Sequence, residues 1–558
     1  MRGRFVSALV LAANAVLACK KDGPTGSQQP GVGAVELELG DVRYLTAAEK
    51  SAFTVGRGEY TLVIFNGSPT GASNLQIEAA GENTAAAAGP PTPAMLPSQL
   101  LAFSSAAAGR PPEYDHRFER ALRQQERRAL QEFAPAARAW QGRRSAARVN
   151  RIAAPPQVGD RITLNTSSRT CTDPSDRVGF VRAISERAII AADSANPDGG
   201  FTDEDYRAFA IAFDTLVYPV SAGNFGVPAD IDENGRSLIF FTRAVNELTE
   251  EGDSTLIGGF FFGRDLLPKS ATGNFQGCAG SNEAELFYML VPDPAGVVNN
   301  NKRPKEQVAR GTIGVLAHEF QHLINASRRI FINNANEPEQ AWLNEGLSHI
   351  GEELTFYRAS GLAPLQNIDL QRLRSSQRIL DAVNAFQVAN LGRLIEYLED
   401  PERNSPYQLD DDLATRGSAW ALLRYAADQK SPAQQPIWFA LVNNVEVGLA
   451  NFTKVFGEGV PRVRDWTVSV YTDDAVSNVP QAFRQASWNY RSIYPAIAPN
   501  YPLKTRQLLG STPVPVTLSG GGGVFFRFSV AANSATVRLT SQSASVPVTV
   551  EAALARTK

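Results

Sequence analysis

The spacing of hydrophobic and polar positions differs between regions of the chain. In residues 35–80 and 504–558, short apolar runs alternate with polar residues and are separated by Gly, Asn and Ser, which predicts strands joined by turns. Around residues 308–324 and 342–354, apolar positions recur every three or four residues, which predicts two helices packed inside a domain. The pattern therefore predicts a central domain with a small β module at each end.

The region around these two helices mixes strand and helix patterns. The domain begins near residues 158–164, the predicted strands are 237–242, 259–262 and 286–291, and the further predicted helices are 180–193, 202–216, 368–398 and 410–428. A sheet followed by two long helices predicts an α+β domain, which we place at residues 157–475. Strand 259–262 or strand 286–291 is a candidate for a sheet edge that binds an extended peptide, and an ordinary internal strand is the alternative for each.

The chain begins with a pattern that is typical of a secretory signal. Two Arg residues precede an apolar run over residues 5–17, which is too short for an ordinary membrane span. Cys19 follows Val-Leu-Ala, which predicts a signal peptide at residues 1–18 and a lipid-modified Cys19 that begins a flexible tether, residues 19–34. A plain signal peptide or an inert Cys is the alternative. We therefore expect an exported protein of the bacterial cell envelope, either lipid-anchored or secreted.

Composition and cysteine usage agree with an exported, globular protein. The 558 residues are 43% hydrophobic and carry a formal net charge of −3, which gives no indication of a nucleic-acid partner. With Cys19 assigned to a lipid, Cys171 and Cys278 are the remaining pair, and they would meet an oxidising compartment. We predict a disulfide between them, with two buried free thiols as the alternative. The oligomeric state is not predicted.

One short motif carries the chemistry. His318 and His322 are four residues apart, so a helix places both imidazoles on one face, where they can reach one metal ion. Glu319 is rotated away from that pair and is better placed to act on a metal-bound water than to bind the metal. The chain has four His, so two of them in one motif are informative. Two satisfied histidines on a core helix are the alternative interpretation.

A third ligand is expected, because a catalytic zinc usually takes three protein ligands and one water. Glu345 follows a turn-rich connection and lies on a second helix, for which Pro338 is a first-turn residue. The apolar face of that helix would pack it against the first helix and bring Glu345 towards the metal. An exposed helical Glu is the alternative.

These two segments resemble a known class of enzymes. His318-Glu-Phe-Gln-His322 and Trp342-Leu-Asn-Glu-Gly-Leu-Ser348 are similar to the motifs of the gluzincin class of metallopeptidases, and most closely to the hyicolysin-type family of secreted bacterial enzymes. More loosely, the resemblance extends over residues 157–475. It implies a zincin-like α+β catalytic domain with a mixed sheet beside the active-site helices.

The resemblance also implies a role for each motif residue. The zinc ligands would be His318, His322 and Glu345, with Asn344 supporting them and Glu319 as general base and acid. The zinc would lower the pKa of its water towards about 7 and polarise the scissile carbonyl. Glu319 would take the proton and hand it to the departing amine. The implied activity is the hydrolysis of peptide bonds.

Two positions depart from the pattern of the class. Many gluzincins carry an Asp four residues after the Glu ligand to hold a His, whereas this chain has His349 there and Glu352 one turn later as a substitute. Relatives often steady the oxyanion with a Tyr on a later helix, whereas this chain has Arg416 there, which is our candidate for that role. Tyr407, Tyr425 and His349 are rivals, and an ion-pairing or surface role is the alternative for Arg416.

Residues 81–156 separate the first β module from the catalytic domain. Ala, Pro, Gly and Ser dominate residues 81–112, which are predicted to form a linker. Residues 113–133 are highly charged with a sparse apolar side, which predicts a solvated helix that docks weakly. This helix is either a spacer or part of an inhibitory propeptide, and the spacer is favoured because the segment has no zinc-blocking group such as a free Cys.

One loop of the middle region is a candidate cation site. Asp230, Asp232 and Asn234 place oxygen atoms at alternate positions before Gly235, as in the first half of a calcium loop. The position that holds the final Glu of an EF-hand is Phe241, inside a predicted strand. A full EF-hand is therefore excluded. A turn is the favoured interpretation, and a Ca²⁺ site is the alternative.

Taken together, the sequence predicts an exported zinc-dependent metalloendopeptidase. Its α+β catalytic domain would continue through a connector, residues 476–503, into a β-sandwich-like end module, residues 504–558. The expected partners are a protein or peptide substrate and, through the N-terminal lipid, a membrane. Two alternatives stay open, namely a surface binding or adhesion protein that retains a zinc site, and a zinc amidase that cuts cell-wall links. Intact Glu319 argues against the first.

Overall fold

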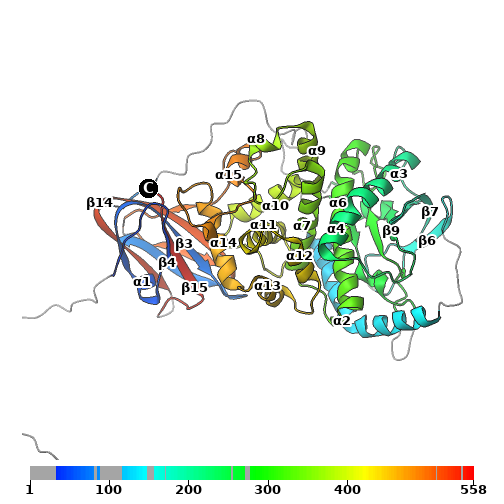
Figure 1. The fold of residues 1–558 in the computed structure, drawn as a ribbon, viewed down its shortest axis with the longest axis horizontal. Coiled ribbons are helices and arrows are strands. Elements are labelled where there is room, and N and C mark those ends of the chain that lie inside the picture. The colour runs from blue at the N-terminus through cyan, green and yellow to red at the C-terminus, as the bar shows by residue number, and fades with distance from the viewer. Residues whose placement is uncertain are drawn as a thin grey trace, which may run out of the picture.

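The computed structural model describes residues 33–80, 84–87, 116–147, 156–169, 171–252, 256–270, 277–510, 512–541 and 545–558. Three parts follow one another along the long axis: a large sheet, a block of helices, and a second sheet with its covering helices (Figure 1). The signal peptide, Cys19 and nearly all of the tether lie outside the described residues, so lipidation and localisation stay predictions. Within the described ranges, no helix has the length and apolar character that crossing a membrane requires.

A six-stranded mixed sheet forms one end of the molecule. Its strands are β6 (Arg161–Asn165), β7 (Asp176–Ile184), β8 (Ala188–Asp193), β9 (Ser237–Phe241), β10 (Gly259–Phe261) and β11 (Leu286–Met289). Their order is β10-β11-β9-β8-β7-β6, in which β8, β9 and β11 run parallel and the other pairings are antiparallel. Of the two strands considered as a peptide-binding edge, β10 lies at the edge of the sheet and β11 is internal.

The prediction of a helix at residues 180–193 is wrong, because this segment belongs to the hairpin of β7 and β8. Buried residues alternate along β7 at Gly179, Val181 and Ala183, which is the period of a strand. Every residue of β8 is buried. A short Ala-rich strand that is buried on both faces has no alternation, so periodicity cannot distinguish it from a helix. The other predicted strands and helices of the domain are present.

Helices cover this sheet and fill the centre of the molecule. Those nearest the sheet are α3 (Asp203–Ala212), the π-helical turn η2 (Phe213–Val217), α4 (Tyr218–Phe225), α5 (Arg243–Asn246), the 3-10 turn η3 (Gly263–Leu266), α6 (Lys305–Ser327) and the π-helical turn η4 (Arg328–Ile332). The central block consists of α7 (Ala341–Ser360), α8 (Leu370–Leu373), α9 (Gln377–Phe386), α10 (Val388–Glu399), α11 (Leu413–Lys430), α12 (Gln435–Val442), α13 (Gly448–Phe456), α14 (Val460–Thr472), η5 (Gln481–Phe483), α15 (Tyr490–Ile493) and η6 (Tyr494–Ala496). α6 contacts β10, β11 and α7, and α7 contacts α11. The two predicted metal-bearing helices are therefore packed together between the sheet and the helical block.

The strands at the two ends of the chain form one nine-stranded sheet, so the expectation of two separate β modules is wrong. The strands are β1 (Gly33–Val35), β2 (Val42–Tyr44), β3 (Phe53–Asn66), β4 (Ser73–Ala80), β5 (Thr84–Ala85), β12 (Arg506–Gln507), β13 (Val514–Leu518), β14 (Gly523–Ser541) and β15 (Val550–Arg556), with α1 (Ala47–Ser51) after β2. The main path is β13-β4-β14-β3-β15-β2, so strands from both ends alternate. They share one apolar core that includes Phe53, Leu62, Phe526 and Leu554. Either module alone would leave strand edges unpaired and this apolar face uncovered.

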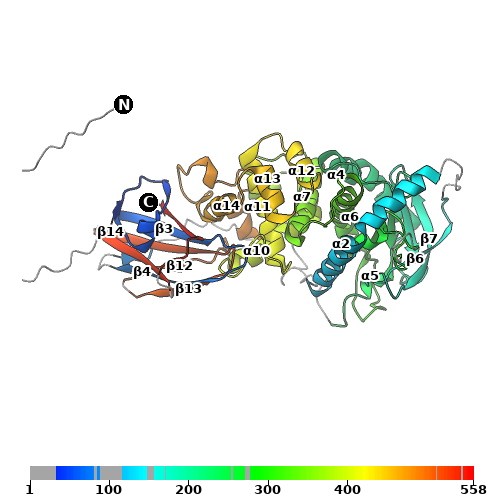
Figure 2. The same cartoon turned by 90° about the horizontal axis from the view of Figure 1, so that it is seen from below.

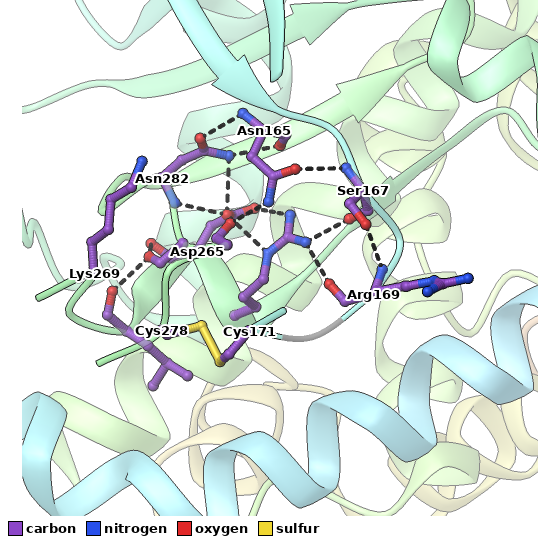
Figure 3. The surroundings of a disulfide bond; sticks show 12 residues. Asn165, Ser167, Arg169, Cys171, Asp265, Lys269, Cys278 and Asn282 are labelled. Carbon is purple, nitrogen blue, oxygen red and sulfur yellow. Dashed lines mark hydrogen bonds and ion pairs between the residues drawn. A yellow bond between two sulfur atoms is a disulfide. The ribbon is translucent and has the colours of Figure 1, made fainter. Parts of the chain in front are cut away.

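A disulfide joins Cys171 to Cys278, as predicted from the sequence (Figure 3). It ties the segment after β6 to the loop that precedes β11. Next to it, the side chains of Arg264 and Asp265 form a fully buried ion pair, and Arg264 also donates to the carbonyl oxygen of Ser167. The disulfide and these polar contacts together fix the segment after β6 against η3.

The charged segment after the linker forms α2 (His116–Ala147), which lies along the half of the molecule that contains α6 and the six-stranded sheet (Figure 2). α2 packs against η3 and η4. Leu122, Leu130 and Ala137 are buried on one side of it, and so are the charged side chains of Arg123 and Glu126. The expectation of a solvated, weakly docked helix is therefore wrong.

Candidate metal centre

The three predicted metal ligands meet where α6 and α7 pack together. His318 and His322 are one turn apart on α6, and their Nε2 atoms lie 3.1 Å from each other. Glu345 projects from α7 towards the same point. Its Oε2 lies 3.3 Å from His318 Nε2, and its Oε1 lies 3.5 Å from His322 Nε2. The structure thus brings two nitrogen donors and one carboxylate together in a buried cluster.

The spacing of these donor atoms fits a tetrahedral zinc ion. Zinc forms bonds of about 2.0–2.1 Å to imidazole nitrogen and carboxylate oxygen, so two ligand atoms on a tetrahedron lie about 3.3 Å apart. The two Nε2 atoms lie 3.1 Å apart, and each lies 3.3 or 3.5 Å from one of the two oxygens of Glu345, so each separation is close to that value. A set of two imidazoles and one carboxylate also matches the three-ligand sets of catalytic zinc sites. The residues present therefore fit this metal.

Each imidazole is oriented by a partner at its Nδ1 atom. His318 Nδ1 lies 2.7 Å from Glu352 Oε1, and an ionised carboxylate only accepts, so Nδ1 carries a proton. His322 Nδ1 lies 3.1 Å from Ser348 Oγ, whose own hydroxyl donates to Gln321 Oε1 at 2.7 Å. In the neutral state both Nε2 atoms therefore direct lone pairs into the cluster, which is the tautomer that metal ligation requires.

The net charge of the cluster depends on whether His318 is protonated. Burial lowers the pKa of His318, but hydrogen bonds with Glu345 and Glu352 outweigh burial and raise that pKa to about 10. Burial lowers the pKa of His322 to about 3. Burial by itself would raise the pKa of Glu345, but Arg416 and His322 hold it well below its usual value. Metal binding would replace the proton on His318, since a ligating imidazole must be neutral.

Glu319 lies beside the cluster and faces the edge of the sheet. Its Oε2 accepts a hydrogen bond from the backbone N–H of Phe261, the last residue of β10, at 2.9 Å. Burial raises the pKa of Glu319 to about 7. A carboxyl group that titrates near neutral pH can both accept a proton and return it.

The other predicted residues on α7 surround the ligands. Glu352, the substitute for the missing Asp, also bonds through Oε1 to His349 Nδ1 at 3.2 Å. The ring of His349 lies 4.8 Å from the ring of His318, between centroids, and burial followed by Arg393 lowers the pKa of His349 to about 3. Asn344 Oδ1 accepts from Asn325 Nδ2 at 2.9 Å, which links α7 to α6 behind the ligands.

Arg416 from α11 closes the cluster on the side of Glu345. Its Nη1 lies 3.2 Å from Glu345 Oε2, while Nε and Nη2 donate to the two oxygens of Asp411 at 3.0 and 2.9 Å. A Cβ atom at Gly346 would lie 2.9 Å from Leu423 Cδ1, so the glycine allows α7 to approach α11 closely. Arg416 therefore holds Glu345 in place in this structure.

Two side chains of α2 cover the cluster. Arg123 Nε donates to Glu345 Oε1 at 3.1 Å, and Arg123 Nη1 donates to the carbonyl oxygen of Phe261 at 3.4 Å. Glu126 Oε1 accepts from the backbone N–H of Gly263 at 2.7 Å. α2 thus binds both the carboxylate of Glu345, a candidate ligand, and backbone groups at the end of the edge strand.

Among the residues that support the centre, Ser348, Arg123 and Asp411 were not predicted from the sequence. Ser348 lies three residues after Glu345 on the same face of α7, so its helical spacing was a usable signal. Arg123 and Asp411 are remote from the motif in sequence, and a buried Arg on a charged helix gives no local signal of its partner.

Comparison with known proteins gives a partial match. No family model matches the chain. Over 157 residues, the chain is 28% identical to a protein named neutral metalloprotease ShpI from Staphylococcus hyicus. The match covers 28% of this chain and 32% of that protein, so the chain spans about a third of the relative's length. This partial similarity and the buried cluster of His318, His322 and Glu345 support a relationship to metallopeptidases, and to no narrower family.

Proposed function

We propose that the protein is an exported zinc metalloendopeptidase of the gluzincin class, similar to the hyicolysin-type family, with a zincin-like catalytic unit at residues 157–475. The observation that carries the proposal is the convergence of His318, His322 and Glu345, at spacings that suit zinc, beside Glu319 and the edge of the sheet. The partial similarity to a neutral metalloprotease supports the same activity.

Each residue of the centre has a distinct role in this proposal. His318, His322 and Glu345 would hold the zinc, which when bound lowers the pKa of a water and polarises the scissile carbonyl. Glu319, whose Oε2 is fixed by the N–H of Phe261, would accept a proton from water at Oε1 and return it to the nitrogen of the leaving amine.

The edge strand would align the peptide. β10 lies at the edge of the sheet, and an extended peptide could add to it as a further strand once α2 releases the end of β10. The same edge ends next to Glu319, so a peptide bound there would pass the catalytic residues. Arg416 stays our candidate for stabilising the oxyanion, because its guanidinium lies beside Glu345 in a buried setting.

We further propose that α2 holds the site closed in this form of the chain. Arg123 binds the carboxylate of Glu345 and the carbonyl oxygen of Phe261 at the end of β10, and Glu126 binds the N–H of Gly263, two residues further on, so both occupy backbone groups that a peptide would need. These contacts favour the inhibitory interpretation of the charged helix over the spacer. β3 and β4, which precede α2 in the chain, are held in place by pairing with C-terminal strands. To expose the site, α2 therefore has to move away while still attached, or be cleaved from the chain on both of its sides.

A digestion experiment tests the proposed function. Zinc-loaded residues 20–558 that carry Arg123→Ala, in which α2 no longer donates to Glu345, should cleave casein or a peptide library, lose that activity with a chelator, and regain it with zinc. Glu319→Gln should keep its zinc and cleave nothing, because the proton acceptor is lost while the ligands remain. An adhesion protein would bind zinc without cleaving any substrate. A cell-wall amidase would release products from peptidoglycan fragments and leave peptides intact.

A further inference from the structure

We propose a second metal site, for a calcium ion, at the amino-terminal ends of β9 and β11. Asp230, Asp232 and Glu285 place carboxylate oxygens within 4.8 Å of one another. The two Asp residues belong to the loop before β9, and Glu285 immediately precedes β11. β9 and β11 are parallel neighbours in which Leu238 pairs with Leu286, so these two segments meet at the same end of the sheet. The cluster shares no residue with the zinc centre.

Glu285 is the observation that points to a ligand. It is 3% exposed, and its Oε1 accepts from the backbone N–H of Ile231. Its Oε2 is buried and has no hydrogen-bond partner among the described residues. Burial first, and then the charge of Asp232, raise the pKa of Glu285 well above its usual value. A buried oxygen without a donor is costly, and two more carboxylates beside it add repulsion that a bound cation would remove.

The basic side chains nearest to the cluster are engaged elsewhere. Arg187 and Arg236 line the same cavity, which measures about 130 Å³. The guanidinium of Arg187 lies over the ring of Tyr218, 4.9 Å from its centroid, and Arg236 Nε donates to a backbone carbonyl at 2.8 Å. Within the described part of the chain, neither forms an ion pair with Asp230 or Glu285. Asp230 is exposed, so the cavity has a route from solvent.

The donor chemistry favours calcium. All three side chains offer carboxylate oxygen, which suits a hard cation, and calcium accepts a flexible shell of six to eight oxygens that water can complete. Asp230 already accepts from the backbone N–H groups of Asn234 and Gly235 at 3.0 Å each, so the loop is shaped before an ion binds. In an EF-hand, the last position of the loop itself supplies a carboxylate ligand. Here Glu285, which belongs to a neighbouring segment, supplies that carboxylate.

This arrangement changes the ligand set expected from the sequence. Asn234, one of the three predicted oxygen donors, is used inside the loop, where its Oδ1 accepts from the backbone N–H of Arg236 at 2.6 Å. Its Nδ2 donates to Asp232 Oδ2 at 2.6 Å. Glu285 takes its place as the third ligand, and it could not be found by spacing because it lies in a different loop.

Calcium titration of the zinc-loaded chain tests the proposal without reference to peptidase activity. Calcium should raise the melting temperature of the native protein and give a one-site isotherm by calorimetry. Glu285→Gln should abolish both effects, yet melt no lower than the native protein in calcium-free buffer, because it removes an uncompensated buried carboxylate. Glu233→Gln removes the same charge from the loop before β9, at a residue outside the cluster, and it should keep the calcium response.

Two outcomes would overturn the site. The first is no calcium response of the native protein at about 10 mM, which exceeds the dissociation constants of weak extracellular calcium modules. The second is an equal calcium response in Glu285→Gln and the native protein. Because the readouts are melting and binding of calcium alone, either result leaves the proposed zinc centre untouched.

Discussion

Replacing Arg123 by Ala should open the proposed active site. Arg123 is 7% exposed and donates to Glu345 Oε1 at 3.1 Å, across the interface between α2 and the proposed catalytic unit. A hydrogen bond to a charged group contributes about 1.5–3 kcal/mol when it is buried. Since about 1.4 kcal/mol corresponds to a factor of ten, losing this bond, without counting the longer one to the carbonyl oxygen of Phe261, should make the open form roughly 10–150-fold more populated.

The assay is the hydrolysis of a quenched fluorescent peptide by zinc-loaded protein. Activity should rise with the open fraction, by about tenfold or more for Arg123→Ala. Arg128→Ala is the matched control, because Arg128 is an exposed Arg on the same helix and its loss should leave the rate unchanged. The double variant Arg123→Ala/Glu319→Gln should be inactive. An Arg123→Ala protein that is folded, zinc-loaded and no more active than the native protein would refute the closed-site reasoning.

Three further predictions follow from particular contacts. Glu352→Gln should weaken zinc binding about 10–100-fold in a chelator competition, because it removes the charge that orients His318 through Nδ1, and an unchanged affinity would contradict that role. The kcat/KM should fall as the pH is lowered, with an apparent pKa no higher than about 7, since burial raises the pKa of Glu319 to about 7 and a bound cation favours its ionised form. An apparent pKa above 7 would count against Glu319 as the base. Replacing Cys171 and Cys278 by Ala should lower the free energy of unfolding by about 2–4 kcal/mol in a denaturant titration, and an unshifted midpoint would show that the disulfide contributes little.

The arrangement of the candidate metal centre was predictable because its geometry is largely local. The spacing of His318 and His322 fixes their common face once the segment is helical, and the apolar periodicity of that segment makes it helical. Glu345 required one longer step, the packing of α7 on α6, which its own apolar face supports. Glu352 was recognised as a substitute because it lies one turn beyond His349 on the same helix.

The parts that sequence analysis missed depend on contacts between distant segments. β3 and β14 pair although hundreds of residues separate them in the sequence. The local sequence of each predicts a strand but does not indicate which strand it pairs with. The charged pattern of α2 is typical of a solvated helix. Arg123 and Glu126 are nevertheless buried, because Arg123 donates to the carboxylate of Glu345 and Glu126 accepts from the backbone N–H of Gly263. Glu285 likewise joins the acidic loop before β9 only through the neighbouring strand.

X-ray absorption at the zinc edge, on the native chain and on His322→Ala, tests the central claim most directly. The account predicts one zinc per native chain with only nitrogen and oxygen neighbours at about 2.0–2.1 Å, two of them imidazoles. His322→Ala should bind zinc far more weakly and lose one imidazole from the spectrum. A native chain that takes up no zinc, or an imidazole signal that is the same in both proteins, would contradict the assignment of His318, His322 and Glu345 as the ligands.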